Sequence, residues 1–276
     1  MKKIILLLLL VTVLFISSAT CFAQSQNEKF EITSNEVKGE TYSIEVVLPD
    51  GYDAAKKYPT IYFTDWYYAS NLISSLMSVL RYNVEPFIIV GIQDKSSVDE
   101  MSWTKNRTRD LTPTNIKTED SLSHLPAGTS GGAKHYLSFI KNELIPAVEK
   151  KYASDIEKRG YSGYSLGGLF GTYILLNEPD LFNKYLIGSP SLWWDDYLLS
   201  KELIEMKAES LTSINSIFLA VEEEGPQLRG YTEIKMQILQ KKTDALKFET
   251  VIILDENHMT AIPSTFIKGL KFLYGN

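Results

Sequence analysis

Short segments of the strand type alternate along the chain with longer segments of helical spacing. Residues 30–35 and 42–49 alternate apolar and polar side chains, which is typical of strands with one solvent-facing side. Residues 86–93 (PFIIVGIQ) form a nearly continuous apolar run, as strands inside parallel sheets do. Further strands are predicted over 60–65, 158–163, 185–190, 213–223 and 248–257.

The segments between these strands carry apolar residues at helical spacing. The clearest spans 135–152, where Leu137, Ile140, Leu144 and Val148 fall on one side of a helix. Further helices are predicted over 70–82, 166–179, 231–243 and 263–275. Strands and helices that alternate without internal repeats predict an α/β fold, with a mostly parallel, doubly wound sheet and helices on both faces.

One long polar stretch breaks this alternation. Residues 94–130 are rich in Ser, Thr, Asp and Pro, and we expect them to form a loop insertion on the ligand side of the sheet. A composition of 44% hydrophobic and 22% charged residues is ordinary for a globular protein. The sequence therefore predicts a single domain over residues 24–276, long enough to bury a substantial core.

The start of the chain has the features of a secretory signal peptide. Residues 1–23 open with two lysines, continue in an apolar run and end in small residues. The run 4–16 is too short for a comfortable membrane span. We therefore expect export to a periplasm or to the cell exterior, with a lipoprotein linked through Cys21 as the alternative. Because Cys21 is the only cysteine, no disulfide is expected in the mature chain.

The net charge argues against two classes of partner. The formal net charge is −6, and it becomes −8 when the two lysines of the predicted leader are removed. An acidic protein is a poor match for nucleic acid or for an anionic membrane. We expect no nucleic-acid partner and no stable membrane insertion of the mature chain.

The segment YSGYSLGGLF, residues 161–170, places a serine between glycines where a strand meets a helix. Gly163, Ser165 and Gly167 fit the G-x-S-x-G nucleophile elbow, in which the residues two positions from the serine must lack side chains. The motif is short, and a glycine-rich turn used only for close packing is the alternative. The apolar strand before it and the glycines after it favour Ser165 as a nucleophile. The turn would aim the backbone N–H of Leu166 at a substrate oxygen.

A serine nucleophile requires a base, and the sequence contains three histidines. In an elbow-type fold the histidine follows the serine, and only His258 does so. It lies between the last predicted strand and the last predicted helix, so we predict it as the base. His135 is expected at the exposed start of a helix. His124 is expected in the long loop with a surface role, and a position lining the cleft is the alternative.

The acid that orients the histidine should end a strand lying between the serine and the histidine. The segment SIFLAVEEEG offers Glu222, Glu223 and Glu224, of which one should face His258 while the others are solvated. Asp255 is a rival, but it lies in the same loop as His258, an awkward place from which to reach the ring. A polar turn beside a Ser–His dyad is the alternative.

The second oxyanion donor is expected in the loop after the third strand, YFTDWYYAS. The backbone N–H of Trp66 or Tyr67 would supply it, and Trp66, Tyr67 and Tyr68 would floor a binding cleft. An ordinary core cluster of these aromatics is the alternative. Of Trp193 and Trp194, which follow SPSL, we expect one to pack on the helix layer and one to border the cleft. Tyr67 and Trp194 are the substrate-binding candidates among these residues.

Several longer segments of the chain resemble a known family. The likeness covers nearly the whole mature chain and lies in YPTIYFTD, NRTRDLTPT, SGGAKHYLSFIKNELIPAVEKKY, YSGYSLGGLFGTYILLNEPDLFNKYLIGSPSLWWDD and DENHMTAIPSTFIKGLKFLYG. These segments are similar to the putative esterase (esterase D-like) family of α/β-hydrolases. That family holds esterase D, feruloyl and acetylxylan esterases, mycolyltransferases and trilactone siderophore esterases. RTRDLTP and SPSLWWDD look most like the siderophore-esterase branch.

The resemblance implies an α/β-hydrolase fold and a set of roles. Ser165 would be the nucleophile and His258 the base, with Leu166 and Trp66 at the oxyanion hole. The family usually has glycine where this chain has Trp66, so the second oxyanion donor rests on less support than the first.

Spacing similar to that of the family favours Glu224 as the acid, with Glu223 close behind. The family usually has glycine after the valine of the acid strand, and this chain has Glu222 there. The resemblance also puts Arg107 or Arg109 near the cleft, where siderophore enzymes use arginine against an anionic iron–catecholate. The alternative is a pairing of one arginine with a nearby carboxylate, such as Asp110, that orders the loop.

We therefore expect an exported serine carboxylester hydrolase that requires no metal and no organic cofactor. Its substrate would be a small-molecule ester, a siderophore lactone, or a glycan ester such as a feruloyl or acetyl group on a polysaccharide. Acyl transfer to a sugar by an enzyme of the same fold is a further alternative. A binding protein that has lost the chemistry is less well supported, because the serine, the histidine and the glycine pattern are intact.

Overall fold

A computed structural model describes residues 27–115 and 129–276 of the chain. The predicted leader with Cys21, the histidine at position 124 and the middle of the predicted loop insertion lie outside the described residues. Within the described ranges, no helix combines the length and the apolar character needed to cross a membrane.

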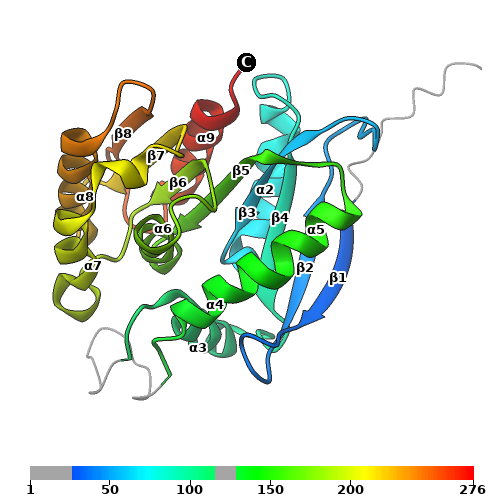
Figure 1. Ribbon diagram of the computed structural model, residues 1–276, viewed down its shortest axis with the longest axis horizontal. Coiled ribbons are helices and arrows are strands. Elements are labelled where there is room, and N and C mark those ends of the chain that lie inside the picture. The colour runs from blue at the N-terminus through cyan, green and yellow to red at the C-terminus, as the bar shows by residue number, and fades with distance from the viewer. Residues whose placement is uncertain (1–26, 116–128) are drawn as a thin grey trace, which may run out of the picture.

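An eight-stranded sheet forms the centre of the molecule, in the order β1-β2-β4-β3-β5-β6-β7-β8 (Figure 1). The pairs β1–β2 and β2–β4 are antiparallel, and all other neighbours are parallel. The strands span Asn27–Thr33 (β1), Thr41–Val47 (β2), Tyr58–Phe63 (β3), Ile88–Asp94 (β4), Ser154–Tyr164 (β5), Lys184–Gly188 (β6), Ser216–Glu222 (β7) and Lys247–Ile253 (β8). The predicted mostly parallel α/β architecture is confirmed.

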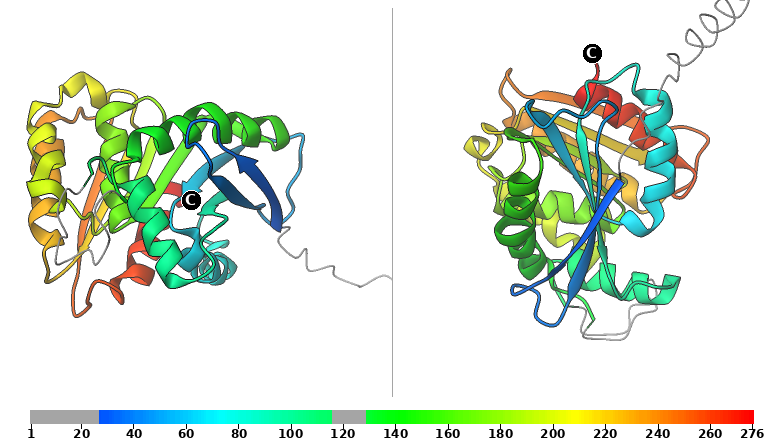
Figure 2. Two further views of the ribbon diagram at one scale, coloured as in Figure 1. Left: turned by 90° about the horizontal axis from the view of Figure 1, so that it is seen from below. Right: turned by 90° about the vertical axis from the view of Figure 1, so that its right-hand side faces the viewer.

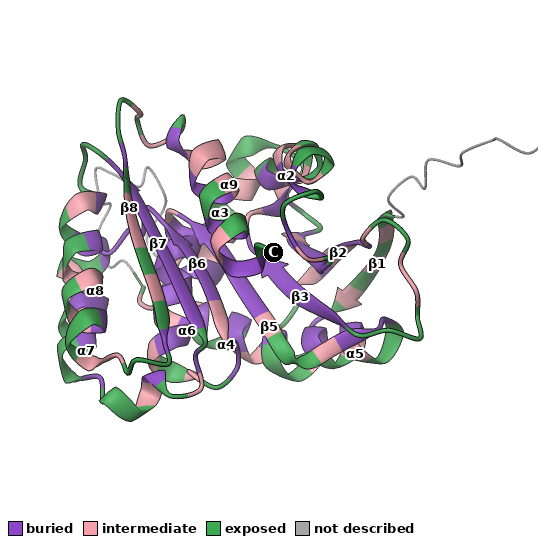
Figure 3. Ribbon diagram, turned by 90° about the horizontal axis from the view of Figure 1, so that it is seen from above, coloured by how far each residue is buried: buried purple, intermediate pink, exposed green. Residues whose placement is uncertain are grey.

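Helices cover both faces of the sheet, as the alternation predicts. They span Trp66–Leu80 (α2), Glu100–Leu111 (α3), Ala133–Phe139 (α4), Ile145–Lys151 (α5), Leu166–Asn177 (α6), Trp194–Glu205 (α7), Gln227–Lys241 (α8) and Ala261–Tyr274 (α9), with short η1 at Ile140–Leu144 and η2 at Ala208–Leu211. Figure 3 shows the buried sheet between α2 and α9 on one face and α4, α5, α6 and α7 on the other. Seen from the β1 edge, the sheet is twisted between α2 and α5 (Figure 2).

The core lies in two apolar layers that the sheet separates. Phe170 of α6 and Ile234 of α8 belong to the larger layer, and Ile73 of α2 and Leu270 of α9 belong to the smaller one. Strands β3, β4, β6 and β7 have side chains in both layers, so most of their positions are apolar, whereas β5 and β8 carry several charged residues. This two-sided burial holds the carboxyl ends of the parallel strands in fixed positions.

Two elements differ from the sequence-based expectation. Residues 94–130 are not a loop throughout, because α3 occupies Glu100–Leu111. The side chain of Asp99 accepts from the N–H of Ser102 at 2.7 Å, and the reciprocal contact completes a capping box. The helix predicted over 135–152 contains the π-helical turn η1 just before Pro146, which has no N–H to give to the preceding turn.

Candidate active site

Ser165 sits in the tight turn between β5 and α6, as the elbow motif predicts. Its φ of 59° is in the left-handed region, a strained position for a residue with a side chain. A Cβ on Gly163 would lie 2.3 Å from the carbonyl oxygen of Gly167, so the turn requires glycine there. The serine therefore stands at the carboxyl end of a parallel strand, where α/β folds place their ligands.

The imidazole of His258 is paired with a carboxylate that the sequence analysis did not favour. Nδ1 of His258 lies 2.8 Å from Oε1 of Glu222, the last residue of β7. Glu224 and Glu223 are exposed, and Glu223 instead accepts from the backbone N–H of Asp255 at 3.2 Å. The structure therefore contradicts Glu224 and Glu223 as partners of His258. The strand end at Glu222 was the usable signal, because its apolar run continues up to that residue.

The environment of Glu222 keeps its side chain ionised. Its side chain is 1% exposed, and this burial alone would raise its pKa. The hydrogen bonds from His258 and Ser189 outweigh burial and hold the pKa of Glu222 below its usual range. A buried carboxylate that faces one ring nitrogen fixes both the orientation and the tautomer of the imidazole.

The strand order brings Ser165 and His258 to the same edge of the sheet. Tyr164, the residue before the serine, donates its hydroxyl to the carbonyl oxygen of His258 at 2.6 Å. The rings of Tyr164 and His258 have centroids 5.1 Å apart. Among the described residues, the hydroxyl of Ser165 contacts Oγ of Ser191 at 3.3 Å, and it makes no direct hydrogen bond to His258. Catalytic hydrogen bonds are often longer before substrate binds.

Two helix N-termini meet beside the serine. Leu166 begins α6, and Trp66 begins α2 after Asp65, whose φ of 61° turns the chain into the helix. N–H groups in a first helical turn have no carbonyl acceptor within their own helix. A Cβ on Gly167 would lie 3.0 Å from Oδ2 of Asp65, so the two turns are in close contact. The backbone N–H groups of Leu166 and Trp66 stay the predicted oxyanion donors.

The indole of Trp66 packs in the core. It is 2% exposed and its Nε1 donates to Glu45 at 2.9 Å. A Cβ on Gly91 of β4 would lie 2.0 Å from this ring, so the ring packs flat on the sheet. For this side chain the alternative of an ordinary core aromatic is correct.

Tyr67 and Tyr68 form an aromatic cluster with Trp103 of α3. The ring centroids are 5.1 Å apart for Tyr67–Tyr68, 6.0 Å for Tyr67–Trp103 and 4.5 Å for Tyr68–Trp103. Tyr68 is 48% exposed, and Tyr67 and Trp103 are partly buried. Tyr67 therefore stays a candidate for substrate contact, and Trp103 is a neighbour that no motif in the sequence singles out.

Arg107 is bound to Asp65, in the loop that carries the predicted second oxyanion donor. Its Nε and Nη2 donate to the two carboxylate oxygens of Asp65 at 2.7 and 2.8 Å, and its guanidinium lies 4.5 Å from the ring centroid of Trp103. Both partners restrict the arginine. Its charge is paired with a carboxylate, which supports the alternative that the arginine orders the loop, and contact with a substrate stays a prediction.

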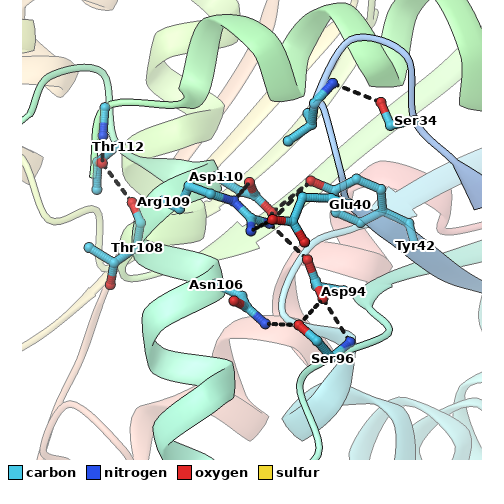
Figure 4. A network of polar contacts seen from close by, with 12 residues as sticks. Ser34, Glu40, Tyr42, Asp94, Ser96, Asn106, Thr108, Arg109, Asp110 and Thr112 are labelled. Carbon is cyan, nitrogen blue, oxygen red and sulfur yellow. Dashed lines mark hydrogen bonds and ion pairs between the residues drawn. The ribbon is translucent and has the colours of Figure 1, made fainter. Parts of the chain in front are cut away.

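Arg109 is held by ion pairs with three carboxylates. It lies in a network of polar contacts with Glu40 at 2.6 Å, Asp94 at 2.8 Å and Asp110 at 2.7 Å (Figure 4). Tyr42 of β2 donates to Asp110 at 2.9 Å within the same network. The alternative of a structural pairing with Asp110 is therefore correct, and it ties α3 to β2 and β4.

The prediction that Trp194 contacts substrate is also contradicted. Its side chain is 2% exposed, and its Nε1 donates to Oγ1 of Thr114 at 3.1 Å. Trp193 is partly buried, with its ring centroid 6.1 Å from that of Trp194. His135 lies exposed near the start of α4, as expected. In residues 27–115 and 129–276, no group of three or more His, Cys, Asp or Glu side chains is arranged to hold a metal ion.

The fold and the site define an α/β-hydrolase, with a strained serine after a central parallel strand and a histidine in the loop after the last strand. Residues 34–223 match the model of the family described as "Putative esterase". The chain belongs to this family and is an esterase, which confirms the resemblance seen in its sequence.

Named relatives support the same assignment. Ferri-bacillibactin esterase BesA of Bacillus subtilis is 26% identical over 259 residues, which cover 87% of this chain and 86% of the relative. The crystal structure of the BES protein from Bacillus cereus matches with a TM-score of 0.78 and 28% identity, over 92% of this chain and 97% of that one. Enterobactin hydrolase IroE in complex with DFP shares the fold, with a TM-score of 0.72 and 19% identity over 91% and 96% of the two chains.

Proposed function

We propose that the protein is a serine carboxylester hydrolase that opens the ester bonds of siderophore lactones. The observation that carries the chemistry is the pair His258–Glu222, 2.8 Å apart at the sheet edge that also holds the strained Ser165. The substrate class is supported by BesA, a ferri-bacillibactin esterase that matches 87% of the chain.

The mechanism follows from the hydrogen-bond pattern. The N–H at Nδ1 of His258 donates a hydrogen bond to the ionised carboxylate of Glu222. Its Nε2 can therefore take the proton of Ser165 as the serine oxygen attacks the ester carbonyl. The N–H groups of Leu166 and Trp66 stabilise the oxyanion. His258 then gives the proton to the leaving alcohol, and the acyl group stays on the serine. A water molecule, deprotonated by His258, attacks the acyl-enzyme; the acyl–Oγ bond breaks, the acid is released, and His258 returns the proton to the oxygen of Ser165.

Contacts near the site bear on the choice of substrate. Arg107 and Arg109 are each paired with carboxylates, so attraction between a basic cleft and an anionic iron complex is not the basis of this proposal. The half-exposed aromatic cluster of Tyr67, Tyr68 and Trp103 follows directly on the oxyanion loop. This cluster offers ring faces for stacking an aromatic acyl group. It also favours a second candidate, an aromatic ester such as a feruloyl group on a polysaccharide.

A substrate panel tests the proposal. We expect wild type to hydrolyse an iron-loaded tricatecholate trilactone with kcat/KM at least about 100-fold above that for methyl ferulate. The variant Ser165→Ala is the blank and should be inert on both. A preference for methyl ferulate would favour the polysaccharide ester. Equal rates for wild type and Ser165→Ala would contradict the serine mechanism itself.

We also propose export through cleavage of residues 1–23, on the sequence pattern alone. Mass analysis of the protein recovered from a bacterial host should give a chain that begins after Ala23. A lipid-modified chain that begins at Cys21 would instead support a lipoprotein, and an uncut chain in the cytoplasm would contradict export.

A further inference from the structure

Four polar groups form a closed ring at the ends of four consecutive strands. Nδ1 of His258 lies 2.8 Å from Oε1 of Glu222, and the other oxygen of Glu222 accepts a hydrogen bond from Ser189. Oγ of Ser189 lies 2.9 Å from the hydroxyl of Tyr164. That hydroxyl donates to the carbonyl of His258 at 2.6 Å, which closes the ring.

The backbone around Ser189 is built to hold this ring. Ser189 follows β6 with φ of 40°, a left-handed conformation that a serine adopts at a cost. Its N–H donates to Ala220 at 2.7 Å. A Cβ on Gly188, the residue before it, would lie 2.5 Å from the ring of Tyr164. Glycine at 188 and the turn at 189 therefore let the phenol ring and the serine hydroxyl approach the carboxylate.

The closed ring of polar contacts has fewer donor protons than contacts, so not every contact can be a hydrogen bond at the same time. Tyr164 gives its one hydroxyl proton to the carbonyl of His258, so it only accepts from Ser189. Ser189 has one proton for both Tyr164 and Glu222, and an ionised carboxylate is the stronger acceptor. Burial raises the pKa of Tyr164, so its hydroxyl remains a donor throughout the neutral range. Both oxygens of Glu222 are thereby held, one by Ser189 and one by His258.

We propose that Ser189 and Tyr164 are positioning residues of the hydrolase, an inference that rests on the proposed function. Ser189 fixes the carboxylate so that its second oxygen meets the imidazole, and Tyr164 fixes the main chain that carries the imidazole. Because Tyr164 directly precedes Ser165, the turn that presents the nucleophile also anchors the loop of the base. Neither hydroxyl is expected to touch the substrate.

Removal of each hydroxyl tests the inference. Ser189→Ala should lower kcat about 10- to 100-fold, since hydrogen bonds to charged groups contribute most, and Tyr164→Phe should lower it about 3- to 10-fold. KM should change less than about twofold if the groups act through the base and not on substrate. The double variant should lose less than the product of the single losses, because both changes act on the pair His258–Glu222.

Matched controls come from buried hydroxyl groups in β5 and β6, the strands that lead to Tyr164 and Ser189. The hydroxyls of Ser162 in β5 and Tyr185 in β6 are buried without a hydrogen-bond partner among the described residues. Ser162→Ala and Tyr185→Phe should therefore leave kcat unchanged. If Ser189→Ala and Tyr164→Phe behave like these controls in kcat, the inference is overturned, even if their melting temperatures fall. Should Ser189→Ala not fold, Ser189→Gly accepts the positive φ and removes the same hydroxyl.

A spectroscopic measurement separates this inference from the proposed function. The proton on Nδ1 of His258, bound to a carboxylate, should give a far-downfield proton NMR signal that weakens or shifts in Ser189→Ala and Tyr164→Phe. It should be unchanged in Ser162→Ala. If wild type and Ser165→Ala are equally inert on every ester, the proposed function fails while this signal still tests the ring. A normal signal in both ring variants would contradict the positioning role.

Discussion

Two buried polar clusters lie at the same edge of the sheet and differ in what they leave free. The first surrounds Arg109 beside β2 and β4, where one guanidinium meets the carboxylates of Glu40, Asp94 and Asp110 (Figure 4). The second links β5 to β8 through the ring that contains Glu222 and His258. In the first, each charge has an opposite charge beside it. In the second, one ring nitrogen and the nearby serine hydroxyl remain available for chemistry.

The difference shows what marks a reactive site in this fold. The carboxylates around Arg109 raise its pKa further, although burial works against the charge, so the guanidinium is a permanent cation used for packing. Burial alone would raise the pKa of Glu222, but its hydrogen bonds lower it, so the carboxylate is an anion at neutral pH. It faces a group that can change its protonation, the imidazole of His258. Charge and burial are common to both clusters, and only the second holds the proposed base, His258, at the sheet edge that also carries the proposed nucleophile, Ser165.

The largest difference between the two clusters is expected in catalysis, when the proposed base of the second cluster is replaced. His258→Asn should lower kcat/KM about 10⁴- to 10⁶-fold, because a triad without its base retains only the oxyanion hole and substrate binding. The measurement is hydrolysis of a p-nitrophenyl ester, with unfolding curves to show that the variant is folded. His135→Asn, an exposed histidine in α4, is the control and should match wild type. A loss below tenfold for His258→Asn would remove the histidine from the mechanism.

The acid should give the next largest effect. Glu222→Gln should lower kcat about 10²- to 10⁴-fold, because an amide stabilises the imidazolium poorly and favours the wrong tautomer. Glu223→Gln and Glu224→Gln alter exposed side chains and should stay within about twofold of wild type. Equal, small losses in all three variants would show that the enzyme works as a dyad.

The Arg109 cluster should respond in stability and not in catalysis. Arg109→Met leaves Asp94 and Asp110 without their cation and should lower the free energy of unfolding by about 3–5 kcal/mol. Denaturant unfolding measures this, and kcat per folded molecule should stay within about twofold. Arg81→Met removes an exposed pair with Asp50 and should cost no more than about 1 kcal/mol. A large fall in kcat for folded Arg109→Met would restore the arginine to the active site.

The parts of this molecule that follow from local pattern were predictable. The apolar runs identify most of the parallel strands, and the elbow motif predicts the tight turn that places Ser165 between β5 and α6. The roles of Ser165 as nucleophile and His258 as base stay predictions. Helix α3 was not predictable in this way, since its sequence EMSWTKNRTRDL has few apolar residues and only one, Leu111, among its buried side chains. Its start depends on the capping box of Asp99 and Ser102, a short-range signal that apolar periodicity does not detect.

The roles that depend on distant contacts could not be taken from the sequence. In RTRD, Arg107 and Arg109 look equivalent, yet one meets Asp65 and the other meets Glu40 and Asp94. In VEEEG, three glutamates are chemically identical, and the position at which β7 ends decides which one faces the histidine. Resemblance to a family gave a spacing for the acid, but this chain has a carboxylate where the family usually has glycine, and the structure uses that residue.

The smallest expected effect is the pH dependence of the unfolding free energy that the carboxylate of Glu222, in the second cluster, contributes. The pKa of Glu222 is lowered in the folded protein, so ionised Glu222 stabilises the fold above the pKa of the unfolded chain, and this stabilisation is lost as pH falls through the lowered value. The difference in unfolding free energy between wild type and Glu222→Gln should therefore shrink from pH 5 to pH 3, by about 1 kcal/mol for each unit by which the pKa is lowered. Glu223→Gln should show no such change relative to wild type. If this difference in unfolding free energy stays constant or grows as the pH falls, the contacts of Glu222 with His258 and Ser189 do not favour its charged form. The ring of polar contacts would then lack its anion.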